Sequence, residues 1–464
     1  MLAAGIRCAA LGRFSLDNDE IMEARWSALP LSRLLHSVAT DGVHPPLDYL
    51  IQAASSRVSG SDVARRLPSV VAGVATVALV MLLGVRWFGG IAGLASGLFL
   101  ALSPIHVRFS QEVRPYSLGL LFLVGAVAAL EEHRRTRGAW SAAIWFVAVL
   151  AAAYTLYFAG LVAVVVSVGF VYAHRSSGLE RVWRRLPIAL AGWFLLYLPW
   201  IPFVIRVARG KPKLDRESID GAWLWYRLQV LGTGDWKVEP VSLGSSAFWF
   251  LVVLGIALAW RRRPAGVAVF WLAAGCALQV LVLQVHPHYP AVRYLLPSWI
   301  GAVLLAGYGL SELAARAPAL RLTGWIALIA VLIFDARTLR DYYDHGRPQW
   351  DRVAAFLREG SRPGDRIVAA NAWTFRNLGY YWNDLRLGRP DAPLERAGPD
   401  LAGPAWLVIA VCPVQPGVGS QLERLPLARS FETTNHCEVR YVPAGRTLSS
   451  PLGLCAGDVW TPDP

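Results

Sequence analysis

The residues best suited to chemistry stand early in the chain, where four carboxylates fall within seven positions. Asp17, Asp19, Glu20 and Glu23 follow a short apolar run, at a point where the chain turns polar. A carboxylate at the edge of an apolar phase is neither fully solvated nor easily neutralised, which favours proton-transfer chemistry. Asp19 and Glu20 are therefore the candidate catalytic pair and the candidate ligands of any metal ion. The alternative is that they only cap a helix or fix it at an interface.

Three further polar clusters follow at wide spacing. His44 stands before two prolines that stiffen the backbone, and the alternative to a binding role is simple contact with lipid headgroups. An acid and a base two residues apart begin an apolar helix in the second cluster, where an internal ion pair with a snorkelling tyrosine is the alternative. In the third, an arginine at a helix end is suited to a phosphate, whereas its histidine spacing is a weak metal signal. The candidates are His44; Gln111, Glu112, Arg114 and Tyr116; and His288, Arg293 and Tyr294.

The composition indicates which elements must position these residues. Of 464 residues, 55% are hydrophobic and only 17% are charged, whereas soluble proteins carry about 25% charged residues. The mean hydropathy of +0.41 agrees with a polytopic membrane protein. The formal net charge of +13 comes from short basic clusters between apolar runs, and no basic face or nucleic-acid motif is present, which excludes a nucleic-acid partner.

Ten apolar runs indicate membrane-spanning helices, and residues 1–11 form a shorter one. Because a span needs about 20 apolar residues, this first run indicates either a stubby helix or a start further upstream. We expect about eleven helices in total. The first loop, 17–66, contains an amphipathic spacing at Leu31, Leu34, Leu35 and Val38 that predicts a helix along the membrane surface. The ten runs are 68–85, 91–105, 116–130, 139–154, 158–172, 187–205, 247–260, 265–285, 294–310 and 322–334.

Arginine placement predicts the orientation in the membrane. Basic residues are retained on the cytoplasmic side, and alternate connections of this chain are rich in arginine. The pattern predicts a cytoplasmic N-terminus, an extracytoplasmic C-terminus and a position in the cytoplasmic (inner) membrane. Every candidate polar cluster then lies on the outer side.

The last part of the chain, 335–464, reads as a separate soluble domain outside the membrane, following a transmembrane domain over 1–334. Residues 350–357 predict an amphipathic helix, and 365–370 and 405–411 predict strands, so we expect a small α/β domain. If this domain is extracytoplasmic, Cys437 and Cys455 are the favoured disulfide pair, and the alternative is separate thiols.

Taken in order, these motifs resemble those of the bacterial family 39-like glycosyltransferases of the GT-C superfamily. This group is related to the protein O-mannosyltransferases and to the lipid A aminoarabinose and galacturonic acid transferases. The resemblance spans about residues 12–334. It rests on Asp19-Glu20, on His44-Pro45-Pro46-Leu47, on Arg66-Leu67-Pro68-Ser69, on 110–116 and on Arg293-Tyr294-Leu295-Leu296-Pro297.

The resemblance implies transfer of a sugar from a polyprenyl-phosphate donor to an acceptor hydroxyl on a lipid, glycan or protein, with inversion. Asp19 would be the general base, because an alcohol needs a carboxylate to accept its proton, with Asp17 as the alternative acid. Glu20 would orient the hydroxyl or help to hold a divalent cation, Mg or Mn. The donor phosphate would be bound by Arg293, Arg114, Tyr294 and Tyr116, and the sugar or acceptor by His44, Glu112, Gln111 and His288.

Two other functions compete with this interpretation. One is a lipid-linked-sugar flippase or transporter, but transporters place ionisable groups near mid-membrane, and here the polar clusters gather at one face. The other is an O-antigen polymerase or ligase, whose key residues usually lie in a large late loop. The moderate loop over 206–245 and the early acid pair favour the glycosyltransferase.

Overall fold

The computed structural model describes residues 1–41, 44–210, 221–233, 243–285, 292–345, 349–362, 365–382, 394–397, 400–410, 418–431, 437–449 and 455. The chain forms two compact units. The first comprises Met1–Leu11 and Glu23–Arg340, and the second comprises Gly12–Met22 and Asp341–Pro464. The predicted boundary after residue 334 stays a prediction. No feature of the sequence predicted that residues 12–22 belong with the C-terminal part.

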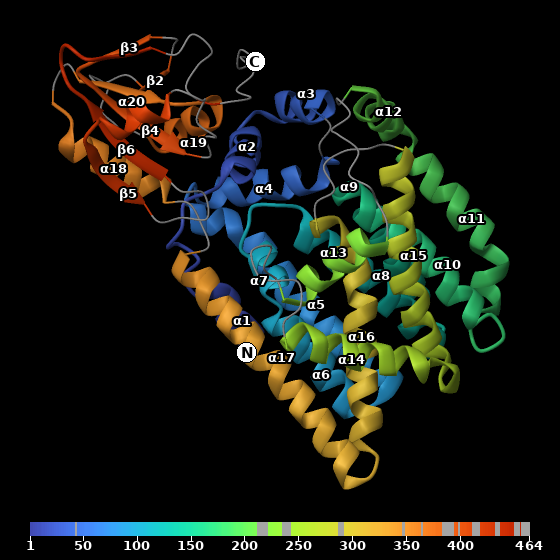
Figure 1. Cartoon of the computed structure of the whole chain (residues 1–464). Helices are drawn as coiled ribbons and strands as arrows, with labels where there is room; N and C mark the ends of the chain where they lie inside the picture. The colour runs from blue at the N-terminus through green and yellow to red at the C-terminus, as the bar shows by residue number, and fades with distance from the viewer. Residues whose placement is uncertain are drawn as a thin grey trace. The chain divides into compact units, whose positions relative to one another are not determined.

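The first unit is a bundle of helices (Figure 1). α2 (Asn18–Ser27) begins in the second unit and ends in the first, and α17 ends in the second. The other elements of the bundle are α1 (Leu2–Cys8), α3 (Leu31–Asp41), α4 (Leu47–Val58), α5 (Asp62–Phe88), α6 (Gly90–Leu102), α7 (Pro104–Ser110), α8 (Tyr116–Thr136), α9 (Ala139–Thr155), α10 (Tyr157–Ala173), α11 (Glu180–Tyr197), η1 (Leu198–Trp200), α12 (Ile201–Gly210), α13 (Gly221–Thr233), α14 (Leu243–Ala257), η2 (Ala259–Arg261), α15 (Arg263–Val285), η3 (Val292–Leu295), α16 (Leu296–Ala314) and α17 (Pro318–His345).

The apolar runs of the sequence are helices, as predicted. Among the described residues six helices are long and apolar enough to cross a membrane, and a seventh span results if α6 and α7, bent by 63°, are counted together. Three shorter apolar helices, α9, α10 and α14, accompany them. The predicted class, a polytopic helical membrane protein with a small C-terminal domain, is confirmed. The count of about eleven stays a prediction, since α1 rises only about 10 Å against a hydrocarbon core of about 30 Å.

The core of the bundle lies along α16, whose residues from Leu296 to Leu310 are all buried. Small residues allow the closest helix crossings, as is usual between membrane helices. A Cβ added at Gly84 in α5 would lie 2.7 Å from the Cα of Gly93 in α6. The hairpin of α5 and α6 therefore requires glycine at this crossing.

The buried Arg7 fixes α1 to the break between α6 and α7. α6 ends before Pro104, which has no N–H to continue the helix, so the last carbonyls of α6 need other donors. The Arg7 guanidinium donates to the carbonyls of Leu100 (3.2 Å) and Ala101 (3.1 Å), and to the Ser110 hydroxyl (3.1 Å). Its Nη2 also lies 2.6 Å from Nδ1 of His106. The first apolar run thus anchors the loop that leads to Arg114.

The amphipathic helix predicted in the first loop is α3. Leu34 and Val38 are buried and pack with Tyr49 and Trp200, while Leu31 and Leu35 face outward. α3 lies beside α12 at one end of the bundle (Figure 1), and the Arg206 guanidinium donates to the Ala39 carbonyl at 3.4 Å. The helix prediction is confirmed, whereas its position along a membrane surface stays a prediction.

The C-terminal part of the second unit is a small α/β domain, as predicted. α18 (Trp350–Gly360) and the parallel strands β1 (Arg366–Ala369) and β4 (Ala405–Ala410) correspond to the three predicted elements. A five-stranded sheet has the order β2-β1-β4-β6-β5, and β3 pairs with β7. Because side chains alternate along a strand, Trp406 meets Phe356 of α18, while Leu407 belongs to the buried cluster that includes Leu422 of α20. The other elements are α19 (Ala372–Trp382), β2 (Leu394–Arg396), β3 (Asp400–Ala402), α20 (Gly419–Glu423), β5 (Leu427–Phe431), β6 (Cys437–Val442) and β7 (Thr447–Ser449).

The favoured disulfide was wrong. Cys455 is disulfide-bonded, but Cys437 is a free, buried thiol. Cys437 begins β6 and pairs in register with Ala410 and Phe431. Its side chain is buried within the domain. Burial raises the pKa of this thiol to about 12, which makes it a poor nucleophile at neutral pH.

Candidate active site

The acid pair lies at the first turn of α2. The Asp17 backbone N–H donates to Oε2 of Glu20 at 3.0 Å, and Oδ1 of Asp17 accepts the Asn18 N–H at 2.7 Å. A glutamate that reaches back from the third helical position to the residue before the helix is the capping-box arrangement. Glu20 is buried and Asp19 is exposed. Glu20 thus has the capping role that the sequence left open, and Asp19 projects from a fixed helix start.

The segment before α2 is attached to α18 and α19 inside the second unit. The Ser15 hydroxyl donates to Oδ1 of Asp351 (2.5 Å) and accepts the Asp351 backbone N–H (3.0 Å). That N–H belongs to the first turn of α18, where backbone donors lack partners within the helix. The Leu16 N–H donates to the Tyr381 hydroxyl at 2.6 Å. Arg376 donates to Oδ1 of Asn18 at 3.4 Å.

No group of three histidine, cysteine, aspartate or glutamate side chains gathers around a common point in the part of the chain that the structure describes. Asp19 and Glu20 alone provide two carboxylates, one of which accepts the Asp17 N–H. The described residues therefore do not make a complete metal site. The divalent cation, Mg or Mn, stays a prediction, and no step below uses it.

A second cluster, in the first unit, centres on the buried Arg114. Its Nη1 lies 3.4 Å from Oε2 of Glu23, and its Nη2 lies 2.9 Å from Nε2 of His44. The Arg114 and Glu23 side chains are 8% and 0% exposed, so this ion pair is shielded from water and depends on close contact. His44 and Arg114 come from different predicted clusters, and the fold brings them together.

Asp48, in the first turn of α4, completes this cluster. Burial raises its pKa to about 6, against the opposing effects of a hydrogen bond to Glu23 and the charge of Arg114. Both Asp48 oxygens are buried, and a hydrogen bond between two carboxyls requires that one of them carry a proton. Glu23 and Asp48 therefore form a carboxyl pair, in which one member ionises with difficulty.

Tyr116 lies close to both Arg114 and Arg293 of η3. The guanidinium carbon of Arg114 lies 5.6 Å from the centre of the Tyr116 ring, and that of Arg293 lies 5.9 Å from the same ring. His44 meets this ring edge-on at 6.0 Å. Tyr294 stacks under Arg293 at 5.6 Å and packs on Phe158 at 5.3 Å. Two arginines almost 180 positions apart in the sequence thus flank one buried tyrosine.

Two predicted residues have other roles in this geometry. Nε2 of Gln111 donates to the carbonyls of Arg7 and Ala9, each at 2.9 Å, so this side chain holds α1 in place. Glu112 accepts from Nε of Arg108 at 2.8 Å, one turn earlier. Neither contact supports the predicted binding of sugar or acceptor. His288 lies outside the described residues.

Sequence reasoning assigned no specific role to Glu23, one of the four early carboxylates, and did not consider Asp48. Glu23 stands three positions after Glu20, and Asp48 two positions after Pro46. Asp48 lies in the first turn of α4, where an acid is ordinarily explained by the helix dipole. The available sequence signal is that both acids have apolar neighbours on each side.

This architecture has counterparts among solved structures. The chain superposes on the crystal structure of ArnT from Cupriavidus metallidurans in the apo state with a TM-score of 0.58 and 14% sequence identity, covering 94% of this chain and 95% of ArnT. The structure of the same ArnT bound to undecaprenyl phosphate gives 0.54 at 14% identity, covering 94% and 96%. The chain thus has an ArnT-like fold, a multi-span helical bundle with a small mixed-sheet domain.

Part of the sequence also matches a family model. Residues 43–205 match the family model described as dolichyl-phosphate-mannose-protein mannosyltransferase. The match includes His44, Asp48 and Arg114 of the cluster above. No curated protein matches the chain. The family match covers 43–205 only, so it shows a resemblance to this family for that part of the chain, while the ArnT structures show the fold.

Proposed function

We propose that this enzyme transfers a sugar from a polyprenyl-phosphate donor to an acceptor hydroxyl at the outer face of the cytoplasmic membrane. Two findings support the donor class. The matched family is named for dolichyl-phosphate mannose, and an ArnT structure of the same fold holds undecaprenyl phosphate. Dolichyl phosphate and undecaprenyl phosphate are both isoprenoid lipids with a phosphate head. Such lipids suit a site in a membrane-spanning helical bundle.

The observation that carries the proposal is the position of Arg114 and Arg293 beside Tyr116. A departing lipid phosphate gains negative charge, and arginines stabilise it by charge-assisted hydrogen bonds. Arg114 is already paired with Glu23 and His44, which fixes its orientation and partly balances its charge. In the proposal Arg293, stacked on Tyr294, is the main phosphate ligand, and Arg114 is the second.

Asp19 acts as the general base in this proposal. The acceptor oxygen attacks the anomeric carbon as its proton passes to Asp19, and the bond from that carbon to the phosphate oxygen breaks. The polyprenyl phosphate leaves with the bonding electrons. Attack opposite to the leaving group inverts the anomeric carbon. A positioned carboxylate contributes about 10²-fold to 10⁴-fold in such a step, and the capping contact of Glu20 keeps the helix start in place.

The experiment that tests the phosphate site compares two arginines at opposite ends of α16. Arg293 precedes the helix, while Arg316 follows it and lies 3.9 Å from Glu312. Undecaprenyl phosphate is titrated into the purified enzyme in nanodiscs, and binding is followed by native mass spectrometry. Arg293→Ala is expected to weaken binding about tenfold or more, which is the loss of about one charge-assisted bond. Arg316→Ala should bind as the wild type does. Equal affinities for all three proteins would remove Arg293 from the donor site.

A further inference from the structure

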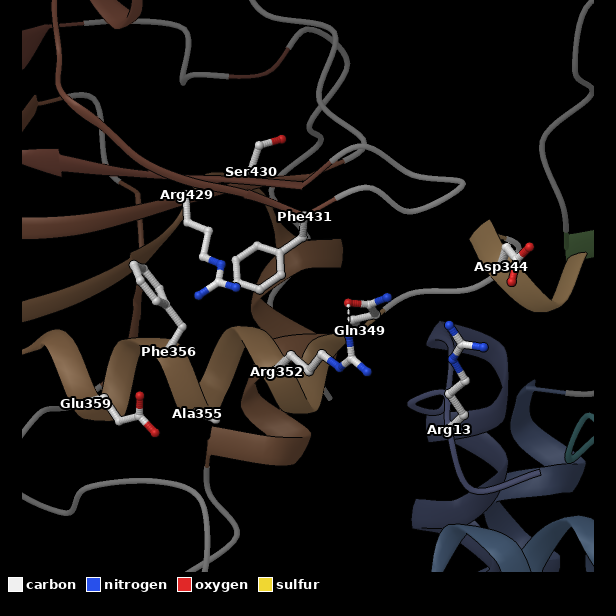
Figure 2. A pocket seen from close by; sticks show the side chains of 10 residues that line it. All are labelled: Arg13, Asp344, Gln349, Arg352, Ala355, Phe356, Glu359, Arg429, Ser430 and Phe431. Carbon is white, nitrogen blue, oxygen red and sulfur yellow. Dashed lines mark hydrogen bonds between the residues drawn. The ribbon is translucent and has the colours of Figure 1, made fainter. Parts of the chain in front are cut away.

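The second unit contains a pocket whose lining residues have no role in the reaction steps given above. Its volume is about 490 Å³, within the range of pockets that bind small molecules, about 300 to 1,000 Å³. Figure 2 shows its lining, which comes from the segment before α2, the end of α17, α18 and β5. Every lining residue belongs to the second unit. The charged and polar members are Arg13, Asp344, Gln349, Arg352, Glu359, Arg429 and Ser430.

One wall of the pocket is aromatic. Phe356 and Phe431 lie 6.0 Å apart in an edge-on arrangement, and the guanidinium carbon of Arg429 lies 5.5 Å from each ring. Figure 2 shows this guanidinium between the two rings. Such stacking holds an arginine in one orientation while its N–H groups stay available for hydrogen bonds. The wall therefore combines an apolar face with a positioned cation.

The remaining lining adds hydrogen-bonding groups with an excess of positive charge. Nη1 of Arg352 donates to Oε1 of Gln349 at 3.2 Å, which directs that arginine along the pocket. Arg13 and Asp344 stand across from Arg429 (Figure 2). Three arginines against two carboxylates favour an anion, and guanidinium groups bind carboxylates in a bidentate manner. A sugar ring offers an apolar C–H face to an aromatic wall and hydroxyls to amides and carboxylates. A sugar that carries a carboxylate therefore matches the aromatic wall, the arginines and the hydrogen-bonding side chains of this pocket.

The pocket is joined to the proposed general base through a single stretch of chain. Arg13 lines the pocket, and Asp19 follows it by six residues. Between them Ser15 is bonded to Asp351 of α18, the residue next to Arg352. α18 thus both lines the pocket and holds the segment that carries Asp19. The pocket and the proposed base therefore belong to one hydrogen-bonded part of the second unit.

We propose that this pocket binds the acceptor of the transfer reaction, and that the acceptor is an acidic saccharide bearing a uronate carboxylate. This inference rests on the proposed glycosyltransferase function and names its acceptor class. Arg352 and Arg429 bind the carboxylate, and Phe356 packs against the sugar ring. Specificity for the acceptor then lies in the C-terminal domain, whereas the donor site lies in the bundle.

The test uses the full-length enzyme in nanodiscs and a hyaluronan tetrasaccharide as the uronate probe, with maltotetraose as the neutral probe. Binding is measured by isothermal titration calorimetry. The expected result is uronate affinity at least about tenfold above that for the neutral probe, equivalent to one bidentate pair. Arg429→Gln and Arg352→Gln should each lower uronate affinity by a similar factor. Arg446→Gln is the matched control, because Arg446 is an exposed arginine of the same domain that bonds the Arg424 carbonyl.

Three outcomes would overturn the inference. These are equal affinity for both tetrasaccharides, uronate binding that survives both arginine replacements, and full competition by inorganic phosphate at equal concentration, which would indicate a simple anion site. Undecaprenyl phosphate binding is measured on the same variants and should not change. If the wild type does not bind undecaprenyl phosphate at all, the result counts against the proposed function instead. Failure of the acceptor inference and failure of the proposed function are therefore distinguishable.

Discussion

Nη2 of Arg114 lies 2.9 Å from Nε2 of His44, while Nη1 of the same guanidinium contacts Glu23 at 3.4 Å. The three residues come from different stretches of the chain, and their burial makes each depend on the others. Removal of the cation would leave Glu23 and Asp48 as adjacent buried carboxyls without a positive charge between them.

Replacement of Arg114 with Gln should therefore destabilise the enzyme by about 3 kcal/mol or more, the usual cost of breaking a buried ion pair. Arg108→Gln is the control, because its pair with Glu112 is only partly buried and such pairs contribute at most about 1 kcal/mol. The measurement is the thermal unfolding midpoint in detergent. Similar shifts for the two variants would contradict the assignment of Arg114 as the centre of the cluster.

The raised pKa of Asp48 predicts a pH dependence of stability. The folded state holds the Asp48 proton up to about pH 6, compared with the ordinary value of 3.8. Stability from this group is thus fully present below about pH 4 and is lost as the pH rises through 6, by at most about 3 kcal/mol. Glu23 and Arg114 face the same group and modulate the change.

The variant Asp48→Asn has no carboxyl group to titrate at this position. Its unfolding midpoint should therefore vary less between pH 4.5 and 7.5 than that of the wild type. Thermal unfolding in detergent across this range measures the difference. Parallel pH profiles for the two proteins would show that Asp48 does not titrate in the folded state as described.

The hydrogen bond from the Leu16 N–H to the Tyr381 hydroxyl predicts an effect on turnover. Tyr381→Phe removes the acceptor but keeps the buried ring, so the segment that carries Asp19 loses one restraint of about 1 kcal/mol, or roughly fivefold in kcat. KM for the donor should stay the same. Tyr441→Phe removes a hydroxyl from β6 of the same domain and should leave kcat unchanged. A change in KM alone would contradict a positioning role for Tyr381.

Asp17 and Asp19 are separated by their roles at the start of α2. Asp17→Asn keeps a side-chain oxygen at the helix cap, where asparagine is as effective as aspartate, so transfer should persist. Asp19→Asn should lower transfer about a hundredfold or more while the protein still folds, because only the base is lost. Initial rates of sugar transfer, with circular dichroism for folding, measure both. A loss confined to Asp17→Asn would move the base to that residue.

Much of the fold could be predicted because its signals are local. A membrane span is an apolar run, and the strands β1 and β4 are short apolar segments after turns. The predicted convergence of His44, Arg114 and Arg293 followed from their loops falling on one side of the alternating spans. Contacts between distant positions carry no such signal. Nothing in Gly12–Met22 indicates that Ser15 bonds Asp351 or that Leu16 bonds Tyr381.

The acids show the same limit. Asp19 and Glu20 look equivalent in the sequence, yet a single capping bond from Asp17 distinguishes them. Glu23 and Asp48 look like ordinary helix acids, and only burial beside Arg114 makes them a coupled pair. Cys437 and Cys455 were the favoured disulfide pair for an extracytoplasmic domain, but Cys437 is a buried free thiol at the start of β6.

The most direct measurement is mass spectrometry of the lipid that co-purifies with the enzyme in mild detergent, for the wild type and Asp19→Asn. The proposed function predicts a polyprenyl monophosphate on the wild type and its sugar-loaded form accumulating on Asp19→Asn, because the donor site is intact and transfer is blocked. The mass of the attached sugar would identify the donor. Recovery of bulk phospholipid alone from both proteins would contradict a polyprenyl-phosphate-dependent glycosyltransferase.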